Sequence, residues 1–227
     1  MKTIGIIGGM GPLATIDIFE KIVNNTPVKK ESDHIPILIA NIPQIPDRTD
    51  SILRNGESPV PAIVESGKKL EREGADFLII PCNTSHYYLD ELQSHFSIPV
   101  LNMVSLTVEK TKEMGIKKVA VLGTEGTLRT GIYKKRLEEE GIDCVTPEEK
   151  DYELMHEAIY DIVKTGDFGR DIGPFKEMLE RYSSEGAEAL ILGCTELPVL
   201  FERYDLDYRV IDPTEILALE SVKKALE

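Results

Sequence analysis

The chain has 227 residues, 41% of them hydrophobic, with 26 lysines and arginines against 40 aspartates and glutamates. This length allows one large domain or two small ones, and either can bury a core without a metal or disulfide. The net charge of −14 argues against nucleic acid or an anionic membrane as the partner, because both need a basic surface. Three scattered cysteines without a C-x-x-C pair predict neither a disulfide framework nor a structural zinc site.

The first apolar run reaches glycine and proline within a few residues, so it resembles a buried strand rather than the apolar core of a signal peptide. No run approaches the 18 apolar residues that a membrane-spanning helix needs. We therefore expect a soluble protein of a reducing compartment, with a cytoplasmic location.

Short apolar runs alternate with amphipathic stretches along the whole chain. The runs are nearly continuous in apolar residues, as parallel strands covered on both faces tend to be, and the stretches between them have helical spacing. This alternation predicts an α/β fold with parallel sheets. In chain order, the predicted strands are 3–7, 37–42, 77–80, 119–122 and 189–192, and the predicted helices are 13–25, 60–73, 104–114, 127–140, 152–165 and 174–184.

The chain also contains an internal repeat. The segment IGIIGGMGPLAT at 4–15 aligns with VAVLGTEGTLRT at 119–130, and four of the twelve positions are identical. The segment EGADFLIIPCNT at 73–84 aligns with EGAEALILGCTE at 185–196, and six of the twelve positions are identical. The offsets of 115 and 112 residues are nearly the same, which is hard to obtain by chance.

A third match has the same order and a similar offset. Val-Leu-Asn at 100–102 aligns with Val-Ile-Asp at 210–212. The repeat predicts two similar α/β halves, 1–105 and 106–212, followed by a closing helix at 213–227 that packs back on the first half.

The repeat pairs two of the three cysteines. Cys82 aligns with Cys194, and each follows a predicted strand and precedes polar residues. In open α/β sheets, ligands bind at the carboxyl ends of the strands. A buried free cysteine usually behaves as a small hydrophobic residue. That interpretation suffices for Cys144, which has no counterpart in the first half.

Paired thiols suit a particular chemistry. If the halves face each other across a pseudo-twofold axis, one thiol approaches each side of a molecule bound in the cleft between them. Inversion of a carbon centre needs one group to remove the proton and another to return a proton on the opposite face. We expect helix starts near Cys82 and Cys194 to lower the pKa of both thiols toward neutral pH, where acid–base catalysis is most effective. Both cysteines are therefore predicted to be catalytic.

Three motifs resemble the aspartate/glutamate racemase family over essentially the whole chain: GIIGGMGP at 5–12, PCNTSH at 81–86 and GCTELP at 193–198. Glutamate racemases of this family typically carry Asp-Ser near the end of the first strand and His after the second Cys-Thr. Here the first position holds GGM and the second holds Glu196. The resemblance therefore favours a member that acts on aspartate.

The resemblance implies an isomerase that interconverts L- and D-aspartate by a two-base mechanism with the thiols of Cys82 and Cys194. It implies no pyridoxal phosphate and no metal. It also implies two flavodoxin-like halves and a homodimer. The only other partner expected is a small amino-dicarboxylate substrate.

Such a substrate brings carboxylates into an acidic protein, so specific cations must receive them. In the family pattern an arginine in a P-x-R-T segment and a lysine of the second half bind the side-chain carboxylate. Arg48 in IPDRTD and Lys164 in IVKTGDFG match these positions, and they lie 116 residues apart, close to the repeat offsets. The alternative for each is a solvated surface charge.

We expect the α-carboxylate to meet backbone N–H groups and hydroxyls of Asn83, Thr84 and Ser85, with Thr195 as their counterpart. Helix starts bind anions in this way, although the same residues also serve as ordinary helix caps. Met10 lies where the family lines its pocket, and the alternative is packing on the core.

Two further residues flank the cysteine motifs. Glu196 is expected either to orient Cys194 or the substrate amino group, or to cap the next helix. His86 is expected either to tune the Cys82 thiol or to lie on a helix surface. The four histidines show no metal-ligand spacing.

Three other functions remain open on the sequence. Residues 9–14 fit G-x-G-x-x-A after a strand, and Glu31 follows about 20 residues later, as in nucleotide-binding modules. A two-lobed amino-acid-binding protein with inert cysteines is a second alternative. A racemase or isomerase of another small acid, such as glutamate, maleate or a hydantoin, is a third.

Overall fold

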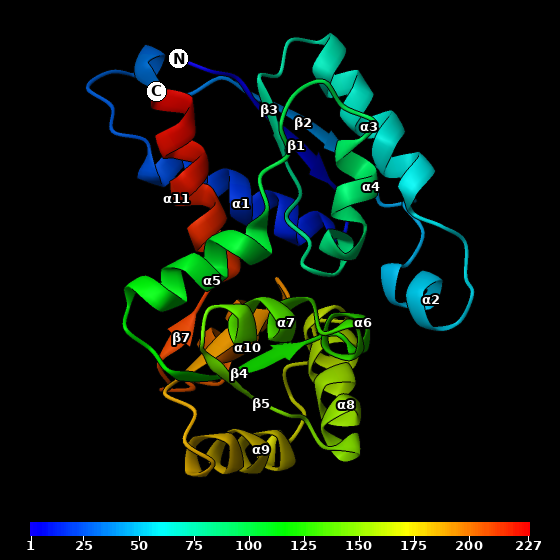
Figure 1. Ribbon diagram of the computed structural model, residues 1–227, viewed down its shortest axis with the longest axis vertical. Coiled ribbons are helices and arrows are strands. Elements are labelled where there is room, and N and C mark those ends of the chain that lie inside the picture. Colours follow the sequence, from blue (N-terminus) through cyan, green and yellow to red (C-terminus); the bar gives the residue numbers. More distant parts are fainter. The chain divides into compact units, whose positions relative to one another are not determined.

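The computed structural model describes residues 1–227, which form two compact units. The first unit contains Met1–Leu106 and Thr214–Glu227, and the second contains Thr107–Pro213. Helix α5 (Met103–Glu113) carries the chain from the first unit into the second (Figure 1). None of the helices is both long enough and apolar enough to cross a membrane.

The first unit is built on a parallel sheet with the strand order β2-β1-β3. An isolated parallel bridge between Leu78 and Val100 extends this sheet beyond β3. Its elements are β1 (Ile4–Gly8), α1 (Pro12–Asn25), the 3₁₀ turn η1 (Glu31–Asp33), β2 (Ile37–Asn41), α2 (Arg48–Leu53), α3 (Val60–Arg72), β3 (Phe77–Ile79), the 3₁₀ helix η2 (Thr84–Tyr88), α4 (Leu89–Gln93) and α11 (Pro213–Leu226).

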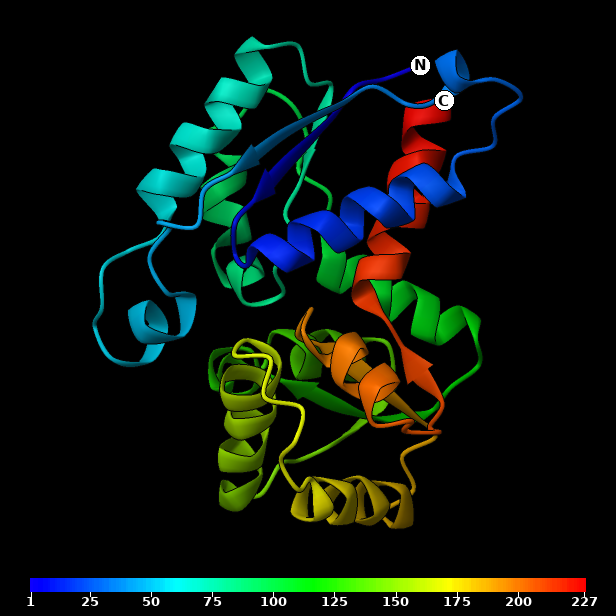
Figure 2. The ribbon, with the colours of Figure 1, turned by 180° about the vertical axis from the view of Figure 1, so that it is seen from behind.

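Apolar side chains of β1 alternate between the two faces of this sheet, as the strand period requires. Ile4 and Ile6 pack in one cluster with residues of α1 and α11, whereas Ile7 packs in another with residues of α3 and α4. Figures 1 and 2 show α1 and α11 on one side of the sheet and α3 on the other. The backbone N–H of Lys2 donates to the Ala225 carbonyl at 2.8 Å, which ties α11 to the start of the chain.

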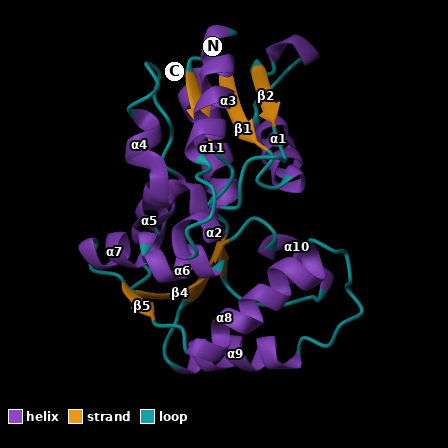
Figure 3. Ribbon diagram, turned by 90° about the vertical axis from the view of Figure 1, so that its right-hand side faces the viewer, coloured by secondary structure: helices purple, strands orange, loops and turns teal.

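The second unit is built on a parallel sheet with the strand order β5-β4-β6-β7. The elements are β4 (Lys118–Gly123), α6 (Glu125–Thr130), α7 (Ile132–Glu139), β5 (Asp143–Val145), α8 (Glu149–His156), the π-helix η3 (Glu157–Val163), α9 (Gly173–Ser184), β6 (Ala189–Gly193), α10 (Leu197–Arg203) and β7 (Val210–Ile211). Figure 3 shows α8 and α9 together on one side of β4 and β5, with α6 and α7 on the other.

A buried carboxylate joins α8 to α9. Asp151 has no exposed surface, and its oxygens accept hydrogen bonds from Arg181 Nη2 at 2.6 Å and from the Tyr182 hydroxyl at 2.9 Å. It also accepts from the backbone N–H of Glu148 at 2.6 Å, which caps α8. Because a buried charge is costly unless it is paired, this network fixes where α8 begins relative to α9.

The two sheets share one pairing register. Leu78 pairs with Val100 in the first unit, and Leu190 pairs with Val210 in the second. The supporting bonds also correspond, because the Leu78 N–H donates to the carbonyl of residue 99 at 2.8 Å and the Leu190 N–H donates to that of residue 209 at 2.9 Å. The prediction of an α/β fold with two similar parallel-sheet halves is therefore confirmed.

Two predicted helices differ from the observed ones. The helix predicted at 127–140 is broken at Gly131, whose φ of 64° is left-handed, and it forms α6 and α7. The helix predicted at 152–165 begins earlier and changes into the π-helix η3. Periodicity alone did not reveal either change, because the apolar spacing continues across both. The short helices α2 and α4 were also not predicted, whereas the helix starts expected after the two cysteines are observed as η2 and α10.

Candidate active site

Cys82 lies just beyond β3 and is 6% exposed. Its main chain is held on both sides. The Cys82 N–H donates to the Ile80 carbonyl at 2.8 Å, and the Cys82 carbonyl oxygen lies 2.9 Å from Nδ1 of His86. The position of the thiol is thus fixed by the turn that leads into η2.

The residues that follow Cys82 are all buried: Asn83, Thr84, Ser85 and His86. Ser85 Oγ donates to Met10 Sδ at 3.3 Å, so the structure brings together two of the predicted substrate-binding residues. Met10 belongs to the same apolar cluster as Cys82. Asn83 precedes η2 without making a side-chain cap, so the capping interpretation is not observed for it.

Arg48 is the first residue of α2, the short helix after β2. Its Nη1 donates to the carbonyls of Pro46 at 3.1 Å and Ile45 at 3.5 Å. Helix α2 packs against η2, and the Tyr88 hydroxyl donates to Ser51 Oγ at 2.9 Å between them. The predicted cation therefore lies on an element that is tied to the Cys82 segment.

Cys194 follows β6 directly and is 8% exposed. Its thiol donates to Oε2 of Glu196 at 3.0 Å, and the Thr195 hydroxyl donates to the same oxygen at 3.2 Å. Burial raises the pKa of the Cys194 thiol well above its ordinary value, and the neighbouring Glu196 carboxylate raises it further. Loss of the thiol proton would create a second negative charge beside the first.

One expectation for this segment is therefore wrong, and one of the two alternatives for Glu196 is not observed. We expected the Cys194 pKa to be lowered by the helix start, but burial and Glu196 outweigh that effect. The capping role considered for Glu196 is also not seen, because α10 begins without a side-chain cap and the carboxylate turns back to Cys194. Glu196 thus contacts the Cys194 thiol, in line with the other alternative considered from the sequence.

Lys164 is the residue that ends η3, and its side chain is exposed. Its Nζ lies 3.8 Å from the centre of the Tyr160 ring, a cation–π contact. The Lys164 charge lowers the pKa of the Cys194 thiol, opposing Glu196. Because η3 packs against α10, this cation belongs to the surroundings of Cys194 in the second unit, as Arg48 belongs to those of Cys82 in the first.

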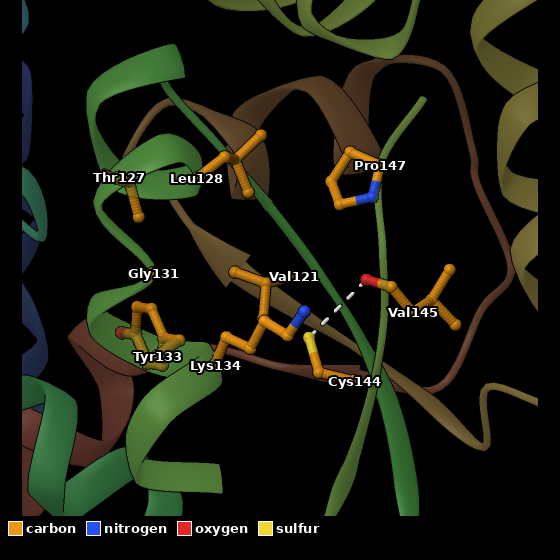
Figure 4. Close-up of a pocket in the computed structure, with 9 residues that line it drawn as sticks. All are labelled: Val121, Thr127, Leu128, Gly131, Tyr133, Lys134, Cys144, Val145 and Pro147. Atoms are coloured by element: carbon orange, nitrogen blue, oxygen red, sulfur yellow. Dashed lines mark hydrogen bonds between the residues drawn. The ribbon is translucent and has the colours of Figure 1, made fainter. Parts of the chain in front are cut away.

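Cys144 occupies a different environment (Figure 4). It lies in β5 beside a small pocket of about 30 Å³ that Lys134 and Tyr133 also line, and its thiol donates weakly to the Val145 carbonyl at 3.5 Å. Burial raises the pKa of the Cys144 thiol to about 11. A thiol that stays protonated fits the inert role predicted for it.

The glycines of the first loop serve packing. The Gly9 N–H donates to Thr15 Oγ1 at 2.9 Å. A Cβ at Gly8 would come within 2.4 Å of that oxygen, and one at Gly9, whose φ is 98°, within 2.4 Å of the Ile42 backbone. These contacts explain Gly8 and Gly9 by packing, so Gly9 of the G-x-G-x-x-A match does not require a bound phosphate. No cluster of three or more histidine, cysteine or carboxylate side chains is placed to hold a metal ion.

The chain matches the family model described as Asp/Glu/Hydantoin racemase over residues 7–220. The chain belongs to this family. It is similar to the solved aspartate racemase of Picrophilus torridus, with 36% identity, a TM-score of 0.83 and coverage of 99% of this chain and 94% of the other. It is 29% identical to the broad specificity amino-acid racemase RacX of Bacillus subtilis (strain 168), with 98% of each chain covered. It is also 32% identical to the glutamate racemase of Persephonella marina (strain DSM 14350 / EX-H1) over 72% of this chain and 64% of the other.

The family resemblance predicted from the three motifs is thereby confirmed. The protein is an amino-acid racemase of the Asp/Glu racemase family, and hence an isomerase. The relatives include aspartate, glutamate and broad specificity enzymes, so they establish the class of reaction rather than the amino acid.

Proposed function

We propose that this racemase interconverts L- and D-aspartate without a cofactor, with Cys82 and Cys194 as its two acid–base groups. The observation that carries the proposal is the equivalent position of the two cysteines. Cys82 follows β3, which pairs with β1, and Cys194 follows β6, which pairs with β4. Each is also buried and free of any disulfide. A reaction that inverts one carbon needs two such groups.

In the proposed reaction, one thiolate removes the proton from Cα and becomes a thiol. The other thiol donates its proton to the opposite face of the same carbon and becomes a thiolate. The proton removed therefore remains on the first sulfur, and the charge passes to the second. Cys194, which donates its S–H to Glu196, is assigned as the group that gives its proton to Cα in one direction, Cys82 is assigned as the group that takes the proton from the opposite face, and the roles exchange in the reverse reaction.

Aspartate is the proposed substrate because each unit supplies one cation near its cysteine segment. Arg48 can hold a carboxylate through two N–H groups, whereas Lys164 supplies a point charge. The α-carboxylate is assigned to backbone N–H groups and hydroxyls of residues 83–85, with Thr195 on the other side. Met10 is assigned to the same substrate pocket, which is supported by the hydrogen bond that Ser85 Oγ donates to its sulfur.

We also propose that the enzyme is a cytoplasmic homodimer. Helix α1 exposes three large apolar side chains, with Leu13 64%, Ile16 59% and Phe19 41% exposed. Such a stripe fits a surface that a second copy covers. Replacement of Ile16 by aspartate is expected to yield monomers in light scattering, and an unchanged mass would contradict this assignment of the surface.

The test uses reduced protein, dialysed against chelator and hydroxylamine to remove metal and pyridoxal phosphate. L-aspartate and L-glutamate are incubated separately, and chiral chromatography follows each D-isomer. We expect D-aspartate to form faster than D-glutamate, with the Cys144→Ser variant as an active control. Conversion of glutamate alone would overturn the substrate, and loss of activity on dialysis would overturn cofactor independence.

A further inference from the structure

His86 is bonded through both ring nitrogens although it is only 8% exposed. Nδ1 lies 2.9 Å from the Cys82 carbonyl oxygen, and Nε2 accepts the backbone N–H of Met103 at 3.1 Å. The ring thus joins the turn that carries Cys82 to the first residue of α5. Of the two roles considered from the sequence, placement on a helix surface does not hold because the ring is buried, and the ring contacts the carbonyl oxygen of Cys82.

These contacts fix the tautomer of the ring. A backbone N–H can only donate, so Nε2 must carry the lone pair and Nδ1 must carry the hydrogen. Nδ1 therefore donates to the Cys82 carbonyl. The neutral ring has both nitrogens engaged, so it has no proton to exchange with a substrate without breaking one of these bonds.

The hydrogen bond from His86 constrains the direction in which the Cys82 side chain points. The Cys82 N–H is already held by the Ile80 carbonyl, and His86 holds the carbonyl of the same residue. With both ends of the residue fixed, only rotation about the Cα–Cβ bond remains for the sulfur. Met103 anchors the ring in turn, and its helix α5 leads into the second unit.

The second unit has neither the histidine nor the backbone N–H that anchors it. The repeat aligns His86 with Pro198, which has no acceptor in its side chain, and Met103 with Pro213, which has no backbone N–H. There Glu196 holds the thiol of Cys194 directly. The donor and its acceptor are thus present together in one unit and absent together in the other.

We infer that His86 is a positioning residue that aims the Cys82 thiol through the main chain of Cys82, without touching the substrate. This inference rests on the proposed function for its catalytic consequence. The geometric consequence, control of Cys82 alone, is independent of turnover. Small displacements of a reacting group cost up to about 10²-fold in rate, which sets the scale of the effect.

The test compares His86→Ala, His86→Asn and His86→Gln with His95→Gln, an exposed histidine of the same unit. Asparagine places an N–H donor where Nδ1 was, whereas glutamine replaces only the acceptor at Nε2. Alkylation of each cysteine by iodoacetamide is followed separately by peptide mass spectrometry, and kcat and KM are measured in both directions.

We expect His86→Ala to lower kcat by about 10–100-fold while KM changes by less than about threefold. Alkylation of the buried Cys82 should rise several-fold and that of Cys194 should not. His86→Asn should recover most of both properties, and His86→Gln should not. Unchanged Cys82 alkylation in His86→Ala, or equal increases at Cys82 and Cys194, would overturn the inference.

The asparagine and glutamine variants carry the test if the alanine variant does not fold. Loss of the rate in His86→Asn with wild-type behaviour in His86→Gln would overturn the inference, because it would show that only the anchor on α5 matters. If the wild-type protein does not racemise aspartate, the proposed function fails, whereas the alkylation result still decides the role of His86.

Discussion

The two units share a strand order and a pairing register, yet they hold their equivalent cysteines by different means. In the first unit His86 fixes the main chain of Cys82, and the thiol has no carboxylate two residues away. In the second, Glu196 accepts the hydrogen of the Cys194 thiol itself. A repeat can therefore keep a sulfur at the same place in the fold while its protonation is set by neighbours that differ.

This difference suits a reaction with exchanging roles. Two acid–base groups with identical surroundings have no built-in preference for which of them carries the proton, whereas different surroundings favour the proton on one of them. Glu196 supplies that bias by raising the pKa of the Cys194 thiol. Lys164 limits it, because its charge acts in the opposite direction.

Removal of either thiol should give the largest effect. We expect Cys82→Ala and Cys194→Ala each to lower the racemisation rate by about 10²–10⁴-fold, because one of the two acid–base groups is lost. Cys144→Ser, with its thiol outside the proposed mechanism, should keep wild-type activity. Chiral chromatography of the product measures all three. Near wild-type activity in either alanine variant would break the equivalence of the two cysteines.

The buried carboxylate of the second unit should give the next largest effect. Asp151→Asn removes the buried carboxylate that pairs with Arg181 and leaves the guanidinium only its more exposed pairs with Glu148 and Glu185, and breaking a buried pair costs about 3–5 kcal/mol of unfolding free energy. Chemical denaturation measures the loss, and hydrogen exchange should rise first in α8 and α9. Exposed Asp207→Asn is the control. A loss below about 1 kcal/mol for Asp151→Asn would contradict the structural role assigned to the pair.

The cation of the first unit should have a smaller effect. Arg48→Gln is expected to raise KM for aspartate and to lower kcat/KM about tenfold or more, because a charge-assisted bond to the carboxylate is lost. Preference over monocarboxylic amino acids should disappear with it. Exposed Arg72→Gln serves as the matched control. Unchanged kinetics on aspartate for Arg48→Gln would remove Arg48 from the site.

Glu196→Gln tests the protonation bias itself. Because the Glu196 carboxylate raises the pKa of the Cys194 thiol, its replacement by a neutral amide should lower that pKa. At a fixed pH below the pKa, the thiolate fraction and the alkylation rate of Cys194 should then rise, and the alkylation rate of Cys82 should not change.

The same change affects stability with a defined sign. A thiol whose pKa is raised by folding stabilises the fold while it is protonated, and this contribution fades as pH rises above the ordinary thiol pKa of about 8.5. Glu196→Gln should therefore flatten the alkaline loss of unfolding free energy. A steeper loss, or slower alkylation of Cys194, would contradict the cause assigned to the raised pKa.

The repeat made much of the fold predictable. Buried strands are recognisable in the sequence as continuous apolar runs. The helix ends also follow a residue pattern, because a left-handed end favours glycine. The glycines that follow helices 60–73, 104–114, 127–140 and 174–184 all have positive φ: Gly74, Gly115, Gly141 and Gly186. Gly131 is also left-handed, but the sequence did not indicate a break there, because the apolar spacing of a helix continues past it. The π-helix before Lys164 also leaves no signature in the spacing.

The site was less predictable, because the contacts that orient Cys82 and set the pKa of Cys194 cannot be read from sequence order. The tie between His86 and Met103 spans 17 residues and depends on the 3₁₀ turn η2. The direction of the Cys194 pKa depends on the side chain of Glu196 turning back toward the sulfur rather than capping α10. One signal was available: His86 and Met103 both align with prolines in the second half.

The central claim, that two thiols act on opposite faces of one carbon, is tested most directly by racemisation of L-aspartate in D₂O. Mass spectrometry after chiral separation measures deuterium at Cα in both isomers early in the reaction. The account predicts deuterium in the D-aspartate formed, donated by the second thiol, and protium in the L-aspartate that remains. D-aspartate that retains the original proton, or L-aspartate that loses it as fast as product forms, would contradict a two-base mechanism.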